Sequence, residues 1–355
     1  MFTSVSIHNF RCFEDLTINS LNRINLIAGK NNVGKTALLE AIFLLADGSN
    51  LLRTIALTNI RGVHKVNRLS GNELVFSPLF RQFSTENTVK ISGLLNTGER
   101  HTIELWLAAG DSIQLDTSDE LITDIEATTR DLASHVLWSK YTNPSGESYS
   151  SQIWIEDQNI RIQTKARNLP FPVYFLTANA SQTAEQDAEL FGRLEVVRES
   201  HNLLESLKVV EPRLERLATI VVAGTPILHG DIGLSRMFPL SFMGDGLRSL
   251  NRILLAIANA SGGIVLIDEF ENGLHHSVLK KIWQAVGDAS CRSNTQVFAT
   301  THSYECIQAA HQAFTENNGY DFRLHRLDRI GEQIKAITYD QEILEAATKA
   351  ELEVR

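Results

Sequence analysis

Residues 29–36 read Gly29-Lys30-Asn31-Asn32-Val33-Gly34-Lys35-Thr36, which matches the phosphate-loop pattern G-x-x-x-x-G-K-[ST]. Such a loop wraps its amide groups around phosphates, while the lysine reaches the terminal phosphates and the last hydroxyl ligates Mg²⁺. An apolar run before the loop predicts a strand, and helical spacing after it predicts a helix. A glycine-rich turn with an exposed lysine would not require this context. The residues expected to bind nucleotide are therefore Gly29, Asn31, Asn32, Val33, Gly34, Lys35 and Thr36.

A second chemical signal is a pair of carboxylates, Asp268 and Glu269, directly after the apolar run 264–267. The run reads as a buried parallel strand, and the carboxyl end of such a strand is where α/β sheets place ligand chemistry. Alone, the pair would be a charged turn. Combined with a phosphate loop, it predicts that Asp268 holds Mg²⁺ together with Thr36, and that Glu269 orients and polarises the attacking water.

His302 closes the next apolar run, 296–300, and lies 34 residues after Asp268. That spacing is the size of one strand–helix–strand unit, so both side chains are expected at the same edge of one sheet. A lone histidine at a strand end is usually a surface residue, but this register favours a hydrogen-bond donor beside the terminal phosphate. The predicted catalytic residues are therefore Glu269, His302 and Lys35.

Ser241-Phe242-Met243-Gly244-Asp245-Gly246 precedes a helix that begins near Leu247. A hydroxyl and free amides at a helix start form a potential anion site. A simple capping turn with Asp245 as the cap explains the local sequence equally well, and both interpretations stay open. Because the chain has one complete phosphate loop, a second site of this kind would serve a nucleotide held by a partner.

Strand and helix patterns alternate through the last third of the chain, which predicts a mainly parallel sheet with crossover helices. Residues 86–108 and 153–162 instead read as antiparallel hairpins. The predicted fold class is α/β, with a phosphate-loop core and an antiparallel β lobe. We expect one domain, 1–355, made of a nucleotide-binding core (1–46 plus 170–355) and an inserted β-rich lobe (47–169).

Composition limits the other functional classes. The 355 residues are 43% apolar and 21% charged, which is typical of a globular protein. The net charge of −9 excludes a general DNA-coating protein, so DNA contact would need a local basic patch. The best candidate for such a patch comprises Arg53, Arg61, Lys65 and Arg68, although a solvated loop is the more common explanation of such a cluster.

The three cysteines are far apart, which excludes a disulfide framework and fits a reducing cytosol. No apolar stretch predicts a secretory signal or a membrane span, so we expect a cytoplasmic protein with no membrane partner. The adjacent His275 and His276 are not expected to bind metal, because no third ligand is in view.

Together, Ile7-His8-Asn9-Phe10-Arg11-Cys12-Phe13, the phosphate loop, SFMGDG (241–246), IVLIDEFENGLHH (264–276) and FATTHS (298–303) resemble ABC-type ATPase heads of the RecF/SMC/OLD group. The likeness is greatest to stand-alone OLD-like AAA ATPases of bacterial genome maintenance and phage defence. It covers 1–46 and 236–315. It implies a head-to-tail homodimer that sandwiches ATP and Mg²⁺, in which Ser241, Gly244 and Gly246 act on the partner's nucleotide. It also makes 271–275 the dimer-contacting D-loop.

This sequence departs from the pattern of that group in three places. The signature reads MGDG, which brings Asp245 near a phosphate. The glutamine that usually contacts Mg²⁺ has no obvious counterpart, and Gln82 is the residue we assign to this role. OLD proteins carry a TOPRIM nuclease domain, whereas about 50 residues follow His302 here. Nuclease or toxin chemistry is therefore expected on a separate effector protein.

Three functions compete on this evidence. The first is an ATP-hydrolysing dimer, or a higher oligomer, that acts on DNA or controls a nuclease or toxin effector. The alternative is an ATP-dependent clamp or scaffold with slow or no hydrolysis; Glu269 favours the hydrolysing enzyme. A transporter subunit is disfavoured, because the 232 residues between Thr36 and Asp268 far exceed what a transporter cassette uses.

Overall fold

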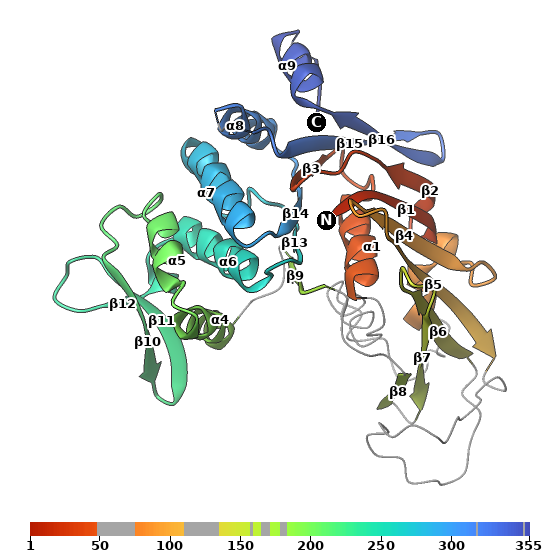
Figure 1. Cartoon of the computed structure of the whole chain (residues 1–355), viewed down its shortest axis with the longest axis horizontal. Helices are drawn as coiled ribbons and strands as arrows, with labels where there is room; N and C mark the ends of the chain where they lie inside the picture. Colours follow the sequence, from red (N-terminus) through yellow and green to blue (C-terminus); the bar gives the residue numbers. More distant parts are fainter. Residues whose placement is uncertain are drawn as a thin grey trace.

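The computed structural model describes residues 1–47, 75–109, 135–156, 159–164, 171–177, 183–316, 319–350 and 352–355. The described residues build two large sheets and one small sheet with helices between and around them (Figure 1). The basic cluster Arg53, Arg61, Lys65 and Arg68 lies outside the described residues.

A six-stranded sheet forms the centre of the fold. Its order is β16 (Gln333–Tyr339), β15 (Phe322–Ile330), β3 (Ile24–Ala28), β14 (Gln296–Thr300), β13 (Ile264–Ile267) and β9 (Val173–Leu176). Neighbouring strands from β15 to β9 pair in parallel, and β16 pairs antiparallel with β15. Strands β3, β13 and β14 are buried along their whole length, because helices cover both faces of the sheet.

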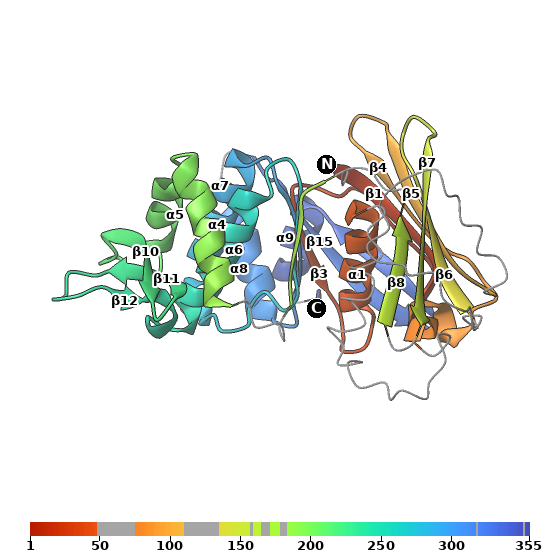
Figure 2. The same ribbon diagram turned by 90° about the horizontal axis from the view of Figure 1, so that it is seen from below.

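Helices cover the central sheet on both faces (Figures 1 and 2). On one face lies α1 (Lys35–Asp47), and on the other lie α6 (Asp245–Asn259), α7 (Leu279–Arg292) and α8 (Tyr304–Thr315). The strands alternate accordingly: Leu26 and Val265 belong to the core on the α6–α8 side, and Ile27 and Leu266 belong to the core around α1. Two hydrophobic cores thus hold the sheet rigid where its strands end.

The second large sheet covers the outer side of α1 and is antiparallel throughout. Its order is β2 (Phe13–Ile18), β1 (Phe2–Phe10), β4 (Val89–Leu95), β5 (Arg100–Ala109), β6 (His135–Thr142), β7 (Ser148–Glu156) and β8 (Asn159–Thr164). The expected hairpins are therefore present. This sheet also takes in β1 and β2, which the predicted division places in the core (1–46). The division into a core and an inserted lobe itself stays a prediction.

A buried ion pair links the antiparallel sheet to the helix that begins at the phosphate loop. Arg11 follows β1 and places its Nε 2.5 Å from Oε2 of Glu40 in the middle of α1, with side-chain exposures of 9% and 0%. The Arg11 backbone N–H also donates to Leu79 O, at 3.0 Å. The motif around Arg11 therefore anchors α1 against the sheet that covers it.

The remaining elements form an arm beside α6 (Figure 2). They are α4 (Ala184–Val196), α5 (Ser200–Leu207), and the sheet β10 (Arg216–Val222), β11 (Thr225–Asp231) and β12 (Phe238–Pro239). The described residues also include four one-turn helices: η2 (Ser77–Leu79), η3 (Arg81–Phe83), η5 (Leu240–Phe242) and η6 (His276–Val278). Helix η6 precedes α7, and α9 (Gln341–Lys349) follows β16. No helix among the described residues is long and apolar enough to span a bilayer.

Candidate functional site

The phosphate loop runs from the end of β3 into α1 with a backbone that only glycine fits at two positions. Gly29 has φ 141°, and a Cβ there would lie 2.6 Å from Leu327 O. Gly34 has φ 98°, and a Cβ there would lie 2.6 Å from Cys12 Sγ. Positive φ at both glycines lets the loop curl over the start of α1, where amide groups favour an anion. Asn31 and Asn32 are exposed on this curl, and Val33 is buried beneath it.

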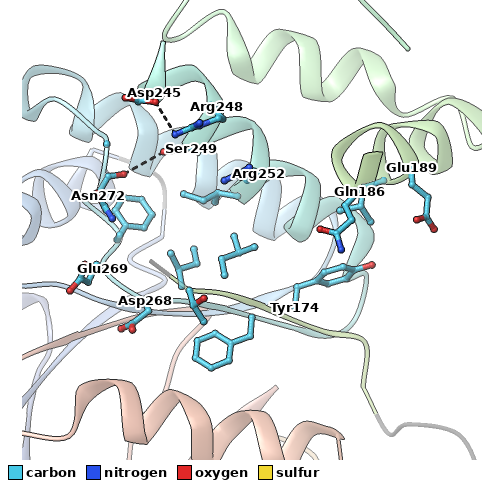
Figure 3. A pocket seen from close by; sticks show the side chains of 18 of the residues that line it. Tyr174, Gln186, Glu189, Asp245, Arg248, Ser249, Arg252, Asp268, Glu269 and Asn272 are labelled. Atoms are coloured by element: carbon cyan, nitrogen blue, oxygen red, sulfur yellow. Dashed lines mark hydrogen bonds and ion pairs between the residues drawn. The ribbon is translucent and has the colours of Figure 1, made fainter. Parts of the chain in front are cut away.

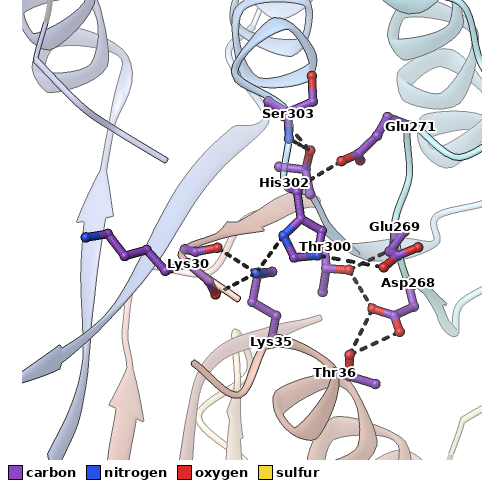
Figure 4. Close-up of polar contacts among 11 residues, drawn as sticks. Lys30, Lys35, Thr36, Asp268, Glu269, Glu271, Thr300, His302 and Ser303 are labelled. Atoms are coloured by element: carbon purple, nitrogen blue, oxygen red, sulfur yellow. Dashed lines mark hydrogen bonds and ion pairs between the residues drawn. The ribbon is translucent and has the colours of Figure 1, made fainter. Parts of the chain in front are cut away.

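Lys35 directs its amine into the loop rather than into solvent. Its Nζ donates to Gly29 O at 2.5 Å and to Lys30 O at 3.0 Å (Figure 4). Burial lowers the pKa of Lys35, and the nearby carboxylates of Asp268, Glu271 and Glu269 oppose that shift. The loop thus holds a partly desolvated cation against its own backbone carbonyls, which is an arrangement suited to a polyphosphate.

Thr36, the next residue, faces the carboxylate that ends β13. Thr36 Oγ1 lies 3.2 and 3.1 Å from the two carboxylate oxygens of Asp268. Thr300, at the end of the neighbouring strand β14, donates its hydroxyl to Asp268 Oδ1 at 2.6 Å. Parallel pairing of β13 with β14 brings these two strand ends to the same edge, so the carboxylate is held in a fixed orientation.

Glu269 and His302 complete the cluster (Figure 4). Glu269 has φ 56°, and its N–H donates to Thr300 Oγ1 at 2.8 Å. His302 Nδ1 lies 3.2 Å from Lys35 Nζ, and its Nε2 lies 3.7 Å from Glu269 Oε1. Because an ammonium can only donate, Nδ1 accepts from Lys35, and the neutral ring then carries its proton on Nε2, facing the carboxylate. The predicted catalytic residues are therefore in mutual contact.

The residues present fit a Mg²⁺ ion. Mg²⁺ prefers hard oxygen ligands and usually takes one or two from the protein, with the rest from phosphates and water. Thr36 and Asp268 offer a hydroxyl and a carboxylate about 3 Å apart, both at the mouth of the phosphate loop. Within the described ranges, no group of three or more His, Cys, Asp or Glu side chains could hold a metal ion by itself. The rings of His275 and His276 lie 4.1 Å apart between centroids and are tilted by 37° to each other.

The signature-like segment lies apart from this cluster, at the start of α6. Ser241 ends up exposed in η5, and Gly244, with φ 103°, is the residue before α6. Asp245 is the first helical residue rather than the cap, and it pairs with Arg248 at 2.8 Å. Ser249 donates to Asn272 O at 3.4 Å, so this segment and the expected D-loop share one surface (Figure 3).

A cavity of about 630 Å³ opens beside that surface and reaches Asp268 and Glu269 (Figure 3). Its far wall carries Arg248 and Arg252 of α6. Arg252 pairs at 3.7 Å with Asp187 of α4, whose pKa burial raises to about 6, against the opposing effect of Arg252. The cavity therefore lies between the ends of the central strands and the helices α4 and α6.

Gln82 is not brought to the cluster. It is exposed in η3 with φ 53°, beside Arg81, which pairs with Glu14 at 3.2 Å. Within the described ranges, no hydrogen bond joins Gln82 to Thr36 or Asp268, so its metal role stays a prediction. Sequence reasoning missed Thr300. The Thr-Thr-His-Ser ending of the apolar run could have signalled it, because a hydroxyl at a strand end can hold a neighbouring strand's carboxylate.

Comparisons with known proteins agree with this geometry. A family model described as "AAA domain, putative AbiEii toxin, Type IV TA system" matches residues 24–307. An ATP/GTP phosphatase of Helicobacter pylori is 25% identical over 371 residues, which cover 97% of each chain. The DNA replication and repair protein RecF of Nitrosococcus oceani is 33% identical over 107 residues, 27% of this chain and 29% of RecF.

Two solved structures share the fold over nearly the whole chain. An SMC head bound to the C-winged helix domain of ScpA superposes with a TM-score of 0.53 at 13% identity, covering 98% of this chain and 99% of that one. An Smc head with an extended coiled coil, bound to the C-terminal domain of ScpA derived from Pyrococcus furiosus, gives 0.51 at 11% identity, covering 98% of each. The expected α/β fold class and the ABC-type head of the RecF/SMC group are confirmed; the OLD-like assignment stays a prediction.

Proposed function

The chain belongs to the AAA-domain family whose model it matches and has the fold of an ATPase head of the RecF/SMC kind, and we propose that it binds Mg²⁺ and ATP at its phosphate loop and hydrolyses the ATP between two copies of the chain. ATP is the substrate, and Mg²⁺ is the cofactor. Hydrolysis controls whether the two copies stay associated with each other and with the DNA or effector protein that they act on.

One observation carries this proposal. Side chains from three separate segments meet at the mouth of the phosphate loop (Figure 4): Lys35 and Thr36 at the start of α1, Asp268 and Glu269 after β13, and His302 after β14. Thr36 lies 3.1 Å from Asp268, and His302 lies 3.2 Å from Lys35 and 3.7 Å from Glu269. A cation, a hydroxyl–carboxylate pair, a second carboxylate and an imidazole in contact are what phosphoryl transfer to water requires. A purely structural cluster would not need to lie at a loop that favours anions.

Each side chain has a distinct role in the proposed reaction. Lys35 balances the charge of the terminal phosphates, and Thr36 and Asp268 hold the metal. Mg²⁺, when bound, neutralises charge on the phosphate oxygens. Glu269 is exposed enough to reach solvent, so its carboxylate orients the attacking water and accepts a hydrogen bond from it. With ATP bound, His302 would turn the Nε2–H that now faces Glu269 toward the transferred group, since Lys35 occupies its other nitrogen.

The dimer is proposed from the position of the signature-like segment. Within the described ranges, Ser241, Gly244 and Gly246 at the start of α6 form no hydrogen bond with their own phosphate loop, although they resemble a γ-phosphate contact. A second copy, packed head to tail, would bring them to its partner's nucleotide. The adjacent segment 271–275, largely exposed, would lie in the same interface. Higher oligomers would build on this pair.

The names of the relatives indicate the class of partner on which this ATPase acts. The RecF relative is named for DNA replication and repair, and the matched family is described as a putative toxin. Both support an ATPase that acts on DNA or controls a separate nuclease or toxin effector, in genome maintenance or defence. If Arg53, Arg61, Lys65 and Arg68 contact DNA, replacing all four with Gln should weaken binding and flatten its salt dependence.

The deciding experiment is ATP turnover by wild type and Glu269→Gln, with nucleotide binding and sedimentation measured on both. Glu269→Gln keeps size and hydrogen bonding but loses the charge that polarises water. It should lower turnover by roughly 10²–10⁴-fold while still binding ATP. Because ATP then persists, the variant should be more dimeric with ATP than the wild type. Glu342→Gln, an exposed acid in α9, is the matched control and should behave as wild type.

The clamp alternative predicts a different set of results. A wild-type protein that binds ATP and dimerises but does not turn over would be a clamp or scaffold. Normal turnover in Glu269→Gln, or assembly that ignores ATP, would contradict the proposed sandwich mechanism.

A further inference from the structure

Glu271 makes a contact that neither its position in sequence nor the proposed chemistry requires. Its Oε1 accepts a hydrogen bond from the backbone N–H of His302 at 2.7 Å (Figure 4). The two residues are 31 positions apart and follow different strands, β13 and β14. Glu271 is thus tied directly to the residue whose ring lies between Lys35 and Glu269.

The turn that carries Glu271 is itself held in place. The Asn272 N–H donates to Glu269 O at 2.9 Å, and the Leu274 N–H donates to Glu271 O at 3.0 Å. Gly273 permits the turn with φ 76°. Glu271 is therefore a fixed point relative to Glu269, two residues earlier in the chain.

The His302 N–H lies in a short connection whose neighbours are bonded elsewhere. The Thr301 N–H donates to Ile27 O at 3.0 Å, and the Ser303 N–H donates to Thr301 Oγ1 at 3.0 Å. Ser303 then caps α8 by accepting from the Cys306 N–H. The His302 N–H, between strand β14 and helix α8, therefore donates to Glu271 instead of to either element. The Glu271 carboxylate thus fixes the position of the His302 backbone.

The second carboxylate oxygen of Glu271 is also informative. Oε2 is buried, without a hydrogen-bond partner among the described residues. A buried, half-satisfied carboxylate is a poor choice for stability alone, because an apolar residue would avoid the desolvation. The contact that Oε1 makes with His302 gives this carboxylate a role that an apolar side chain could not fill.

We propose that Glu271 is a positioning residue for His302: it holds the His302 backbone so that the imidazole bridges Lys35 and Glu269. This inference rests on the proposed ATPase function. Removing the carboxylate frees the connection between β14 and α8 and lets the ring leave that bridge. The charge of Glu271 near Lys35 is a separate effect, which the conservative variant isolates.

The test compares Glu271→Ala, Glu271→Gln, His302→Ala and the double variant Glu271→Ala/His302→Ala. Glu271→Ala should lower kcat roughly ten- to a hundredfold with little change in nucleotide affinity, since a small displacement of a reacting group has effects of that size. Glu271→Gln retains an acceptor oxygen and should keep most of the wild-type kcat. The double variant should be no slower than His302→Ala alone, because the positioning effect of Glu271 on turnover passes through His302.

Glu305→Gln is the matched control. Glu305 is exposed in the first turn of α8 and bonds the Ser303 hydroxyl rather than His302. It should leave kcat unchanged.

A second measurement does not depend on activity. Hydrogen exchange at the His302 amide should be slow in wild type and in Glu271→Gln, and at least tenfold faster in Glu271→Ala. Equal exchange in all three, or a double variant whose kcat loss is the product of the two single losses, would overturn the proposal. If the wild-type protein does not turn over ATP, the ATPase function is refuted. Hydrogen exchange at the His302 amide would still show whether Glu271 holds the His302 backbone.

Discussion

Replacing Arg11 with Met should destabilise the protein by leaving Glu40 without its cation. The Glu40 side chain is 0% exposed, so the variant must either keep a buried charge or protonate it. Breaking a buried ion pair by removing one partner typically costs about 3–5 kcal/mol. Protonating an ordinary glutamate at pH 7 costs about 4 kcal/mol, which limits the loss to the same range.

The expected change in melting temperature follows from the size of the chain. An unfolding entropy of about 2.1 cal/mol/K per residue over 355 residues converts 4 kcal/mol into a decrease of roughly 5 °C. The assay is thermal unfolding at pH 7 and pH 5. The deficit should be smaller at pH 5, because protonation becomes cheaper by about 1.4 kcal/mol per pH unit.

Two further variants show whether the pair itself is responsible. Glu40→Gln keeps an acceptor for Arg11 and should cost less than Arg11→Met. Arg11→Met/Glu40→Leu removes both charges and should recover most of the loss, since apolar replacements of buried pairs are often neutral. A loss of stability below about 1 kcal/mol in Arg11→Met would refute this reasoning. So would a loss in the double variant that equals the sum of the losses in Arg11→Met and Glu40→Leu measured separately.

Lys35→Ala should weaken ATP binding by roughly 10²-fold or more, because two or more charge-assisted contacts to phosphates are lost. Isothermal titration calorimetry measures this affinity, and a near wild-type value would count against the nucleotide site. Ser241→Arg should block ATP-dependent dimerisation of Glu269→Gln without preventing ATP binding, as seen by sedimentation; dimers that persist would place the interface elsewhere. Burial lowers the pKa of His325 to about 3, so the folded protein keeps it neutral while the unfolded chain protonates it below about pH 6.5. Stability should therefore fall as the pH drops from 7.5 to 5, by about 2 kcal/mol more in wild type than in His325→Gln; parallel pH profiles in denaturant unfolding would contradict this.

The chemistry of the candidate site could be predicted from short stretches of sequence. Gly29–Thr36, the Asp268–Glu269 pair and His302 each follow an apolar run that reads as a buried strand. Strands buried on both faces leave a strong local signal, and parallel pairing brings their carboxyl ends to one edge. The spacing of 34 residues was therefore sufficient to group Asp268 with His302, and the phosphate-loop motif was needed to add Thr36.

Pairing between distant segments could not be predicted in the same way. Strands β1 and β2 join β4 in the antiparallel sheet rather than the core, and β15 extends the parallel sheet beside β3. Gln82 was assigned only as a counterpart of the glutamine that contacts Mg²⁺ in the resembling group, and it lies in the short helix η3. A strand's own residues specify which of its faces is buried, but not which other strand lies next to it.

The sequence by itself determined that this chain has a phosphate loop, a carboxylate pair and a histidine on neighbouring strand ends, because each depends on residues adjacent in the chain. Only the tertiary structure decided that Arg11 pairs with Glu40, that Thr300 holds Asp268, and that Glu271 holds the His302 amide. Those contacts join residues 29 to 32 positions apart, and their geometry is set by how the two large sheets pack with the helices beside them. A pattern within one segment carries no information about that packing.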